Sequence, residues 1–207
     1  MIYTGLLAYA VWQALPGQRS DPRQRRMGWL AALSMLLNAA WIGVVQADLL
    51  WGSVAVIFAL LANLVWILLI CLDAPPRSRV DALVVDFVFG LYLGWVTIAT
   101  IANTAAAMAS SDVGELGLGA TGWSVVLLVA AAVIGLGYAL YTRGRLGIAL
   151  ALAWGLTWVA IARTTDEPRD TTVAITAGVA AAVTLGSAVV VRLRTARSGD
   201  SAQRARG

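Results

Sequence analysis

The stretch Leu91-Tyr92-Leu93-Gly94-Trp95-Val96-Thr97-Ile98-Ala99-Thr100-Ile101-Ala102-Asn103 is apolar enough to lie in a bilayer, yet it carries aromatic, hydroxyl and amide side chains. At about 100° per residue, Tyr92, Ala99 and Asn103 share one face of a helix, with Trp95 at its edge. A helix surrounded only by lipid has no use for these polar groups. We therefore expect this face to line a ligand cavity inside a membrane helix bundle.

The composition of the whole chain is that of a polytopic membrane protein. Of 207 residues, 60% are hydrophobic and 13% charged, with a mean hydropathy of +0.80, whereas a soluble domain has about 25% charged residues. Strand-like alternation is absent, so each apolar segment is interpreted as a helix with its backbone groups satisfied internally. The fold class predicted is an all-α transmembrane bundle of about seven helices. They span 1–15, 28–47, 50–72, 82–109, 123–142, 145–162 and 171–191.

Several kinds of chemistry are excluded by the residues that are missing. There is no histidine, and Cys71 is the single cysteine, which removes histidine acid–base catalysis, Cys/His zinc sites and internal disulfides. We find no catalytic triad, Walker loop or dinucleotide-binding glycine pattern. The arginines lie between apolar segments rather than on one soluble face, so they do not indicate nucleic acid. The protein is predicted not to be an enzyme and to require no metal or cofactor.

The arginines predict the topology. Thirteen of the 15 fall in alternate connections and in the tail, on one side of the membrane, and two fall on the other. Cytoplasmic loops are enriched in basic residues, so the C-terminus is predicted to be cytoplasmic. Residues 195–207 are expected to form a disordered, arginine-rich tail. The arginines of this tail either only help to set the topology or also bind anionic lipid.

An Asn-x-x-Trp pattern occurs twice, as Asn38 with Trp41 and as Asn63 with Trp66. Positions three apart lie on one helix face, and an amide within the membrane needs a partner. That partner is either a neighbouring helix, which these side chains would then join, or a ligand. Trp95 also has two interpretations: it lines a pocket, or it belongs to the interfacial belt of tryptophans.

Asp86 is the one carboxylate well inside an apolar segment, where charged groups are costly and usually functional. The alternative is that it lies near the headgroups and pairs with Arg77 or Arg79. On the same segment, Gly90 and Gly94 allow a second helix to approach closely. A homodimer through these glycines is one arrangement that this spacing would serve.

The run Tyr92-Leu93-x-Trp95-Val96-Thr97-x-Ala99-x-x-x-Asn103 resembles the last-helix signature of the TspO/MBR family, the tryptophan-rich sensory proteins. Leu37-Asn38-x-x-Trp41 is similar to the third-helix signature of that family, and nine tryptophans agree with it. The resemblance covers 1–109, whose segments would correspond to family helices two to five, so the first family helix would lie upstream. Segments within 110–194 would add three transmembrane helices. Leu91 replaces the family proline.

The resemblance implies an internal pocket for porphyrins, haem-like tetrapyrroles, sterols or related apolar planar molecules. The residues that we predict to contact the ligand are Trp95, Asn103, Tyr92, Ala99, Asn38, Trp41, Asn63 and Trp66. Our leading prediction is thus a multi-pass, ligand-binding or sensory protein of the bacterial inner membrane. The alternatives are a small solute transporter that uses Asp86 and a structural membrane subunit.

Overall fold

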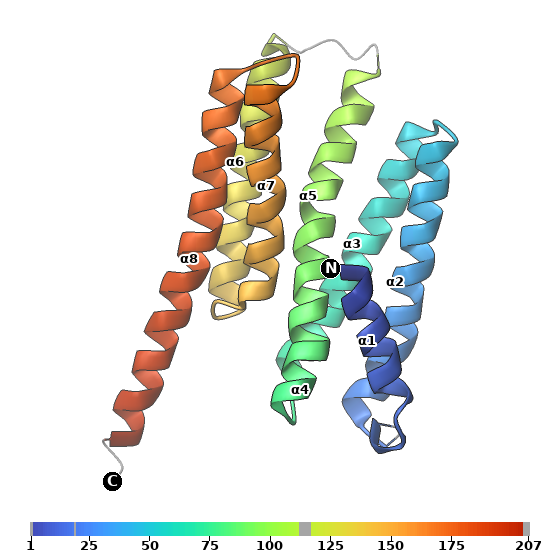
Figure 1. Ribbon diagram of the computed structural model, residues 1–207, viewed down its shortest axis with the longest axis vertical. Helices are drawn as coiled ribbons and strands as arrows, with labels where there is room; N and C mark the ends of the chain where they lie inside the picture. The colour runs from blue at the N-terminus through green and yellow to red at the C-terminus, as the bar shows by residue number, and fades with distance from the viewer. Residues whose placement is uncertain (1, 19, 112–116, 205–207) are drawn as a thin grey trace. The chain divides into compact units, whose positions relative to one another are not determined.

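The structure is a computed structural model that describes residues 2–18, 20–111 and 117–204. It is helical, with no strand among the described residues, and the fold class predicted from the sequence is confirmed (Figure 1). Within the described part of the chain, six helices are long and apolar enough to cross a membrane, and the short α1 is not one of them. The main helices are α1 (Ile2–Ala14), α2 (Pro22–Gln46), α3 (Leu50–Asp73), α5 (Val88–Ala109), α6 (Gly119–Tyr141), α7 (Leu146–Thr165) and α8 (Thr171–Arg204).

The start of α2 differs from the prediction, which placed it at 28 and left the preceding arginines in a loop. Asp21 is the N-cap and its carboxylate accepts a hydrogen bond from the Arg23 backbone N–H at 2.9 Å. Pro22 occupies the first helical turn, where its missing N–H costs nothing. This cap begins the helix six residues earlier than apolarity alone indicates, so Arg23 becomes part of a helix face.

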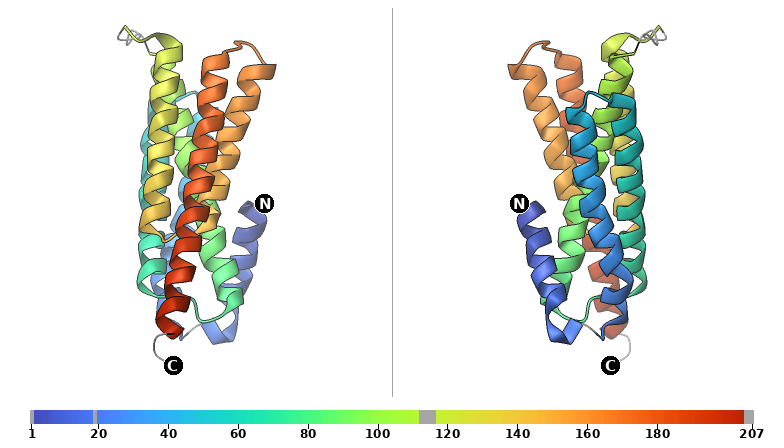
Figure 2. Two further views of the ribbon diagram at one scale, coloured as in Figure 1. Left: turned by 90° about the vertical axis from the view of Figure 1, so that its left-hand side faces the viewer. Right: turned by 90° about the vertical axis from the view of Figure 1, so that its right-hand side faces the viewer.

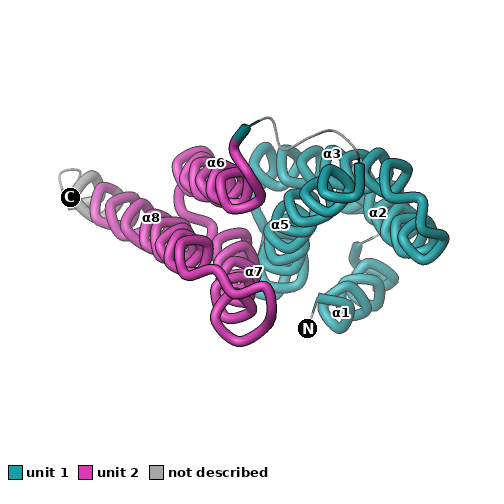
Figure 3. The backbone as a smooth tube through the Cα atoms, turned by 90° about the horizontal axis from the view of Figure 1, so that it is seen from above, with its two compact units in different colours: residues 1–117 teal, residues 118–207 magenta. Residues whose placement is uncertain are grey.

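The chain divides into two compact units, Met1–Gly117 and Leu118–Gly207. In the first, unit 1, the central helix is α3, which packs along both α2 and α5. Seen end-on, α1, α2, α3 and α5 surround a common interior (Figure 3). The short α1 lies beside only the lower half of this unit (Figures 1 and 2). Tyr9 of α1 packs edge-on against Phe89 of α5, with ring centroids 4.9 Å apart.

The helix that contains the opening stretch has an irregular first part. A single turn, α4 (Arg79–Asp81), is capped by the Ser78 hydroxyl and leads into a π-helical segment, η2 (Ala82–Phe87). The π-turn continues without a break into α5. Such turns are rare, occur mostly within α-helices and are frequent at functional sites.

In unit 2 the helices α6 and α7 both pack against α8. Small residues permit this approach: a Cβ at Gly135 would lie 2.6 Å from Oγ1 of Thr184. Gly144, in the turn between α6 and α7, has a φ of +76°, and a Cβ there would lie 2.5 Å from the Ala188 carbonyl oxygen. The small apolar side chains of Ala139, Ala149 and Ala188 form a core cluster in this unit.

The predicted disordered tail is wrong for its first part. The helix α8 continues through Arg204, because the segment contains no proline and adding a residue to an existing helix avoids the cost of nucleation. Residues 205–207 lie outside the described residues, as do residues 112–116, between the predicted segments 82–109 and 123–142. The helix α6 begins at Gly119, four residues before the predicted start.

Candidate functional site

Two residues of the face predicted for the opening stretch, Tyr92 and Asn103, make hydrogen bonds to other helices of unit 1. The Tyr92 hydroxyl donates to the Ser34 carbonyl oxygen of α2 at 3.2 Å, and the tyrosine is 2% exposed. The Asn103 amide N–H donates to Oγ of Ser53 on α3 at 2.9 Å. Both side chains therefore point into unit 1 and join α5 to its neighbours.

The contacts of α5 also define its level along α2. Tyr92 meets Ser34, an offset of 58 residues, and since both helices run in the same direction this offset places Trp41 level with Ala99. Asn103 lies one turn beyond. The Trp41 ring nitrogen Nε1 is buried and has no hydrogen-bond partner, which is uncommon for a buried donor. Trp41 and Ala99 therefore lie at the same level of unit 1, with Asn103 one turn further along α5.

The remaining predicted site residues lie elsewhere. Trp95 is 42% exposed and Trp66 is 62% exposed. The Asn38 amide donates to the Tyr3 hydroxyl of α1 at 3.2 Å. The Asn63 amide donates to the Leu30 carbonyl oxygen at 2.9 Å, while its own Oδ1 is buried without a partner. These amides join helices, which is one of the two roles that the Asn-x-x-Trp pattern left open.

The sequence analysis identified only one member, Asp86, of the most strongly charged site of unit 1. Arg23 of α2 holds two carboxylates at once: Nη1 lies 2.9 Å from Asp81 and Nη2 lies 2.6 Å from Asp86. The side chains of Arg23, Asp81 and Asp86 are 3%, 4% and 12% exposed, so the pair with Asp81 is buried and the pair with Asp86 is partly buried. We call these three residues the ion cluster. The prediction that Asp86 pairs with Arg77 or Arg79 missed Arg23, which had been assigned to a loop.

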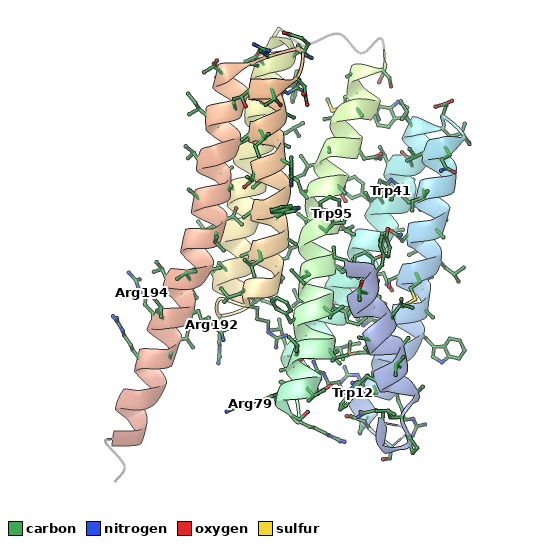
Figure 4. All side chains as sticks on the ribbon, viewed as in Figure 1. Trp12, Trp41, Arg79, Trp95, Arg192 and Arg194 are labelled. Carbon is green, nitrogen blue, oxygen red and sulfur yellow. The ribbon has the colours of Figure 1, made fainter. Side chains whose placement is uncertain are left out.

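Polar side chains from α1 and α2 surround the ion cluster. Gln24 donates from Nε2 to Oδ1 of Asp81 at 3.2 Å, while its Oε1 has no partner. Nε of Arg23 and the Tyr9 hydroxyl are also buried without partners. The exposed Arg77 pairs with the buried carboxylate of Asp21 at 3.3 Å. Trp12 and Arg79 lie at this same end of unit 1, and Trp41 lies toward the other (Figure 4).

The signal that identifies Arg23 from sequence is the Asp21-Pro22 pair. An aspartate followed by proline begins a helix, and in a membrane helix an arginine one residue further needs a buried counter-charge. The positions of Asp81 and Asp86 could not be deduced in the same way. Positions five apart on an α-helix point about 140° away from each other, so a shared partner is not expected.

The interior of unit 1 contains few of the side chains that commonly bind metals. Among the residues described, no group of histidine, cysteine or acidic side chains has the arrangement of a metal site. Cys71 is buried, with its sulfur 3.9 Å from that of Met27. Two residues predicted to contact a ligand have a buried hydrogen-bonding atom without a partner, the Trp41 indole N–H and the Asn63 side-chain carbonyl oxygen. They lie at different levels, because Asn63 is beside Leu30 of α2.

The apolar helices and the polar interior of unit 1 define a multi-pass helical membrane protein. The chain matches the family model of TSPO-like proteins over residues 1–190. It belongs to that family, as the motif resemblance predicted. The match extends past 109, where the motifs ended, and includes α6, α7 and most of α8. No curated protein and no solved structure matches the chain.

Proposed function

We propose that this protein binds a small apolar planar molecule, of the tetrapyrrole or sterol class, within unit 1 and acts as a membrane sensor rather than as an enzyme. Membership of the TSPO-like family supports a binding or sensory role. The observation that carries the proposal is the buried indole N–H of Trp41 without a partner. A buried donor of this kind is satisfied by water or by a ligand.

The residues around Trp41 suit such a ligand. Small-molecule sites are mostly apolar, with a few polar groups that orient the bound molecule. Ala99 is small, and Asn103 holds its amide toward α3 through Ser53. A planar ligand between α2 and α5 would contact the Trp41 ring and accept a hydrogen bond from its indole N–H. It would also lie beside Ala99.

Porphyrin binding measured by Soret absorbance tests the proposal. The change is Trp41→Phe, and the control is Trp29→Phe, on the same helix but 85% exposed. Loss of one hydrogen bond costs about 0.5–1.5 kcal/mol, which weakens affinity by about two- to tenfold. We expect this loss for Trp41→Phe and wild-type affinity for Trp29→Phe. Equal affinities for the two variants would contradict the assignment of Trp41.

A second candidate function, solute transport, is favoured by the buried pairing of Asp86 with Arg23. Ionisable groups within membrane segments are typical of ion and proton pathways. If Asp86 couples transport to protons, Asp86→Asn abolishes pH-dependent uptake into proteoliposomes. Uptake that is unchanged in this variant removes the support for transport.

The third candidate, a structural subunit, draws on the hydrogen bonds of Asn63, Tyr92 and Asn103 between helices. Those bonds are worth about 1 kcal/mol each and need no ligand. On this hypothesis porphyrin has no effect on the protein at all, so Asn103→Leu alters stability but no spectroscopic titration.

For localisation we propose the inner membrane of a bacterium, with the C-terminus in the cytoplasm. Arg23 is taken up by the ion cluster, but the remaining arginines keep the same asymmetry between the two sides. A C-terminal fusion to alkaline phosphatase, which is active only outside the cytoplasm, tests the orientation. We expect an inactive fusion, and activity would reverse the topology.

A further inference from the structure

The ion cluster occupies the part of unit 1 in which the helix before α5 is irregular. Asp81 ends α4, and Asp86 lies within η2, five positions later. On an α-helix these two side chains would diverge by about 140°. In a π-turn the hydrogen bonds run from residue i to residue i+5, so positions five apart lie above one another. The π-turn is therefore what allows a single guanidinium to hold both carboxylates.

The π-turn also decides which face of α5 points inward. It contains one residue more per turn than an α-helix. If it relaxed to α-helical geometry, every residue that follows would rotate by about 100° about the helix axis. Tyr92 would then leave Ser34, and Asn103 would leave Ser53, the two contacts that define the inner face.

We propose that the ion cluster is a clamp that holds the π-turn in place and so sets the rotation of α5. Arg23 and Asp86 are positioning residues on this proposal, since they act on the interior through α5 rather than by touching a ligand. Its consequence for binding rests on the proposed function, because the clamp would orient Ala99 and Asn103 toward Trp41. The rotation itself can be measured without any ligand.

A deletion distinguishes the clamp from a merely stabilising ion pair. Leu83 lies in η2 and is 60% exposed, so its side chain contributes little packing. Deleting it leaves the two carboxylates four positions apart, a spacing that an α-helix places on one face. The deletion thus replaces the π-turn by an α-helical turn and keeps both the clamp and the rotation of α5. Inserting one alanine after Leu83 puts the carboxylates six positions apart, where an α-helix makes them diverge by about 120°.

The rotation is read out by disulfide cross-linking in a Cys71→Ala background. One pair, Ser53→Cys with Asn103→Cys, joins α3 to α5 at a position where the native side chains are 2.9 Å apart. The control pair, Val44→Cys with Gly52→Cys, joins α2 to α3, where a Cβ at Gly52 lies 3.2 Å from Val44. The control does not involve α5, so it reports whether the rest of unit 1 is folded.

We expect the α3–α5 cross-link to form in the background protein and in the Leu83 deletion. We expect its loss in Asp86→Asn and in the alanine insertion, with the control cross-link retained in both. Retention of the α3–α5 cross-link in Asp86→Asn overturns the proposal. Loss of the α3–α5 cross-link in the Leu83 deletion also overturns the proposal, whether or not the control cross-link forms. If Trp41→Phe binds porphyrin as tightly as the wild type does, the proposed function loses its support but the clamp proposal does not.

Discussion

The helices of unit 1 and the helices of unit 2 pack through different kinds of internal contact. Unit 1 buries charged and amide side chains, including Arg23, Asp81 and Asn63. In the described part of unit 2 the buried polar side chains are threonines, Thr142 and Thr184. Its helices instead approach through glycine and alanine. Because buried charges are costly, a protein retains them where they set a geometry or serve a function. The contrast favours unit 1 over unit 2 as the place of the proposed binding site.

Replacing Arg23 by leucine should produce the largest effect, because it leaves two buried carboxylates without their counter-charge. Removing one partner of a buried ion pair costs about 3–5 kcal/mol. Denaturant unfolding followed by circular dichroism measures the loss. The control is Arg26→Leu, which breaks an exposed pair with Asp73, 54% and 67% exposed, and should cost less than about 1 kcal/mol. Equal losses in the two variants would show that burial of the ion cluster adds nothing to the stability of unit 1.

A smaller effect is expected when close packing in unit 2 is disturbed. Gly144→Ala places a Cβ against the Ala188 carbonyl oxygen and the Arg192 nitrogen, at a φ that alanine disfavours. Overpacking of this kind costs about 1–3 kcal/mol. Gly137→Ala on α6 is the matched control, since a Cβ there meets no atom within 4 Å. It should be neutral or slightly stabilising, because alanine favours helix. If Gly144→Ala unfolds no more readily than the control, glycine is not what permits the approach.

The smallest effect concerns the connection between α7 and α8. The Thr121 hydroxyl donates to Asp170 at 2.5 Å, and the Val173 backbone N–H donates to the same carboxylate at 3.0 Å. These hydrogen bonds, that of Thr121 first, lower the pKa of Asp170. A lowered pKa contributes stability above the ordinary aspartate value of about 3.9, and this is lost as the pH falls through the folded-state pKa.

Thr121→Val should therefore raise the pKa of Asp170 toward its ordinary value, and a carboxyl NMR titration would detect the change. The variant should leave stability near pH 7 almost unaltered, because the carboxylate is exposed and solvent screens it. A pKa that does not move would assign the shift to the helix N-terminus alone.

Helix identity was largely predictable from the sequence. Long apolar segments predicted every long helix, and the face shared by Tyr92 and Asn103 followed from their spacing. Boundaries were less predictable, since apolarity does not report a cap such as Asp21 or the continuation of α8 through polar residues. The partners of the amides were not predictable either. A sequence shows that Asn63 needs a partner but not that the Leu30 carbonyl oxygen provides it.

The sequence by itself determined that this chain is a helical membrane protein of the TSPO-like family, because apolar length and a few motif residues are local properties. Only the tertiary structure decided that Arg23 holds Asp81 and Asp86 together. The two ion pairs join residues that are 58 and 63 positions apart in the sequence. They depend on a π-turn, which local helix propensity does not predict. On the proposed clamp, this contact also sets the rotation of α5 and the direction in which the opening stretch faces.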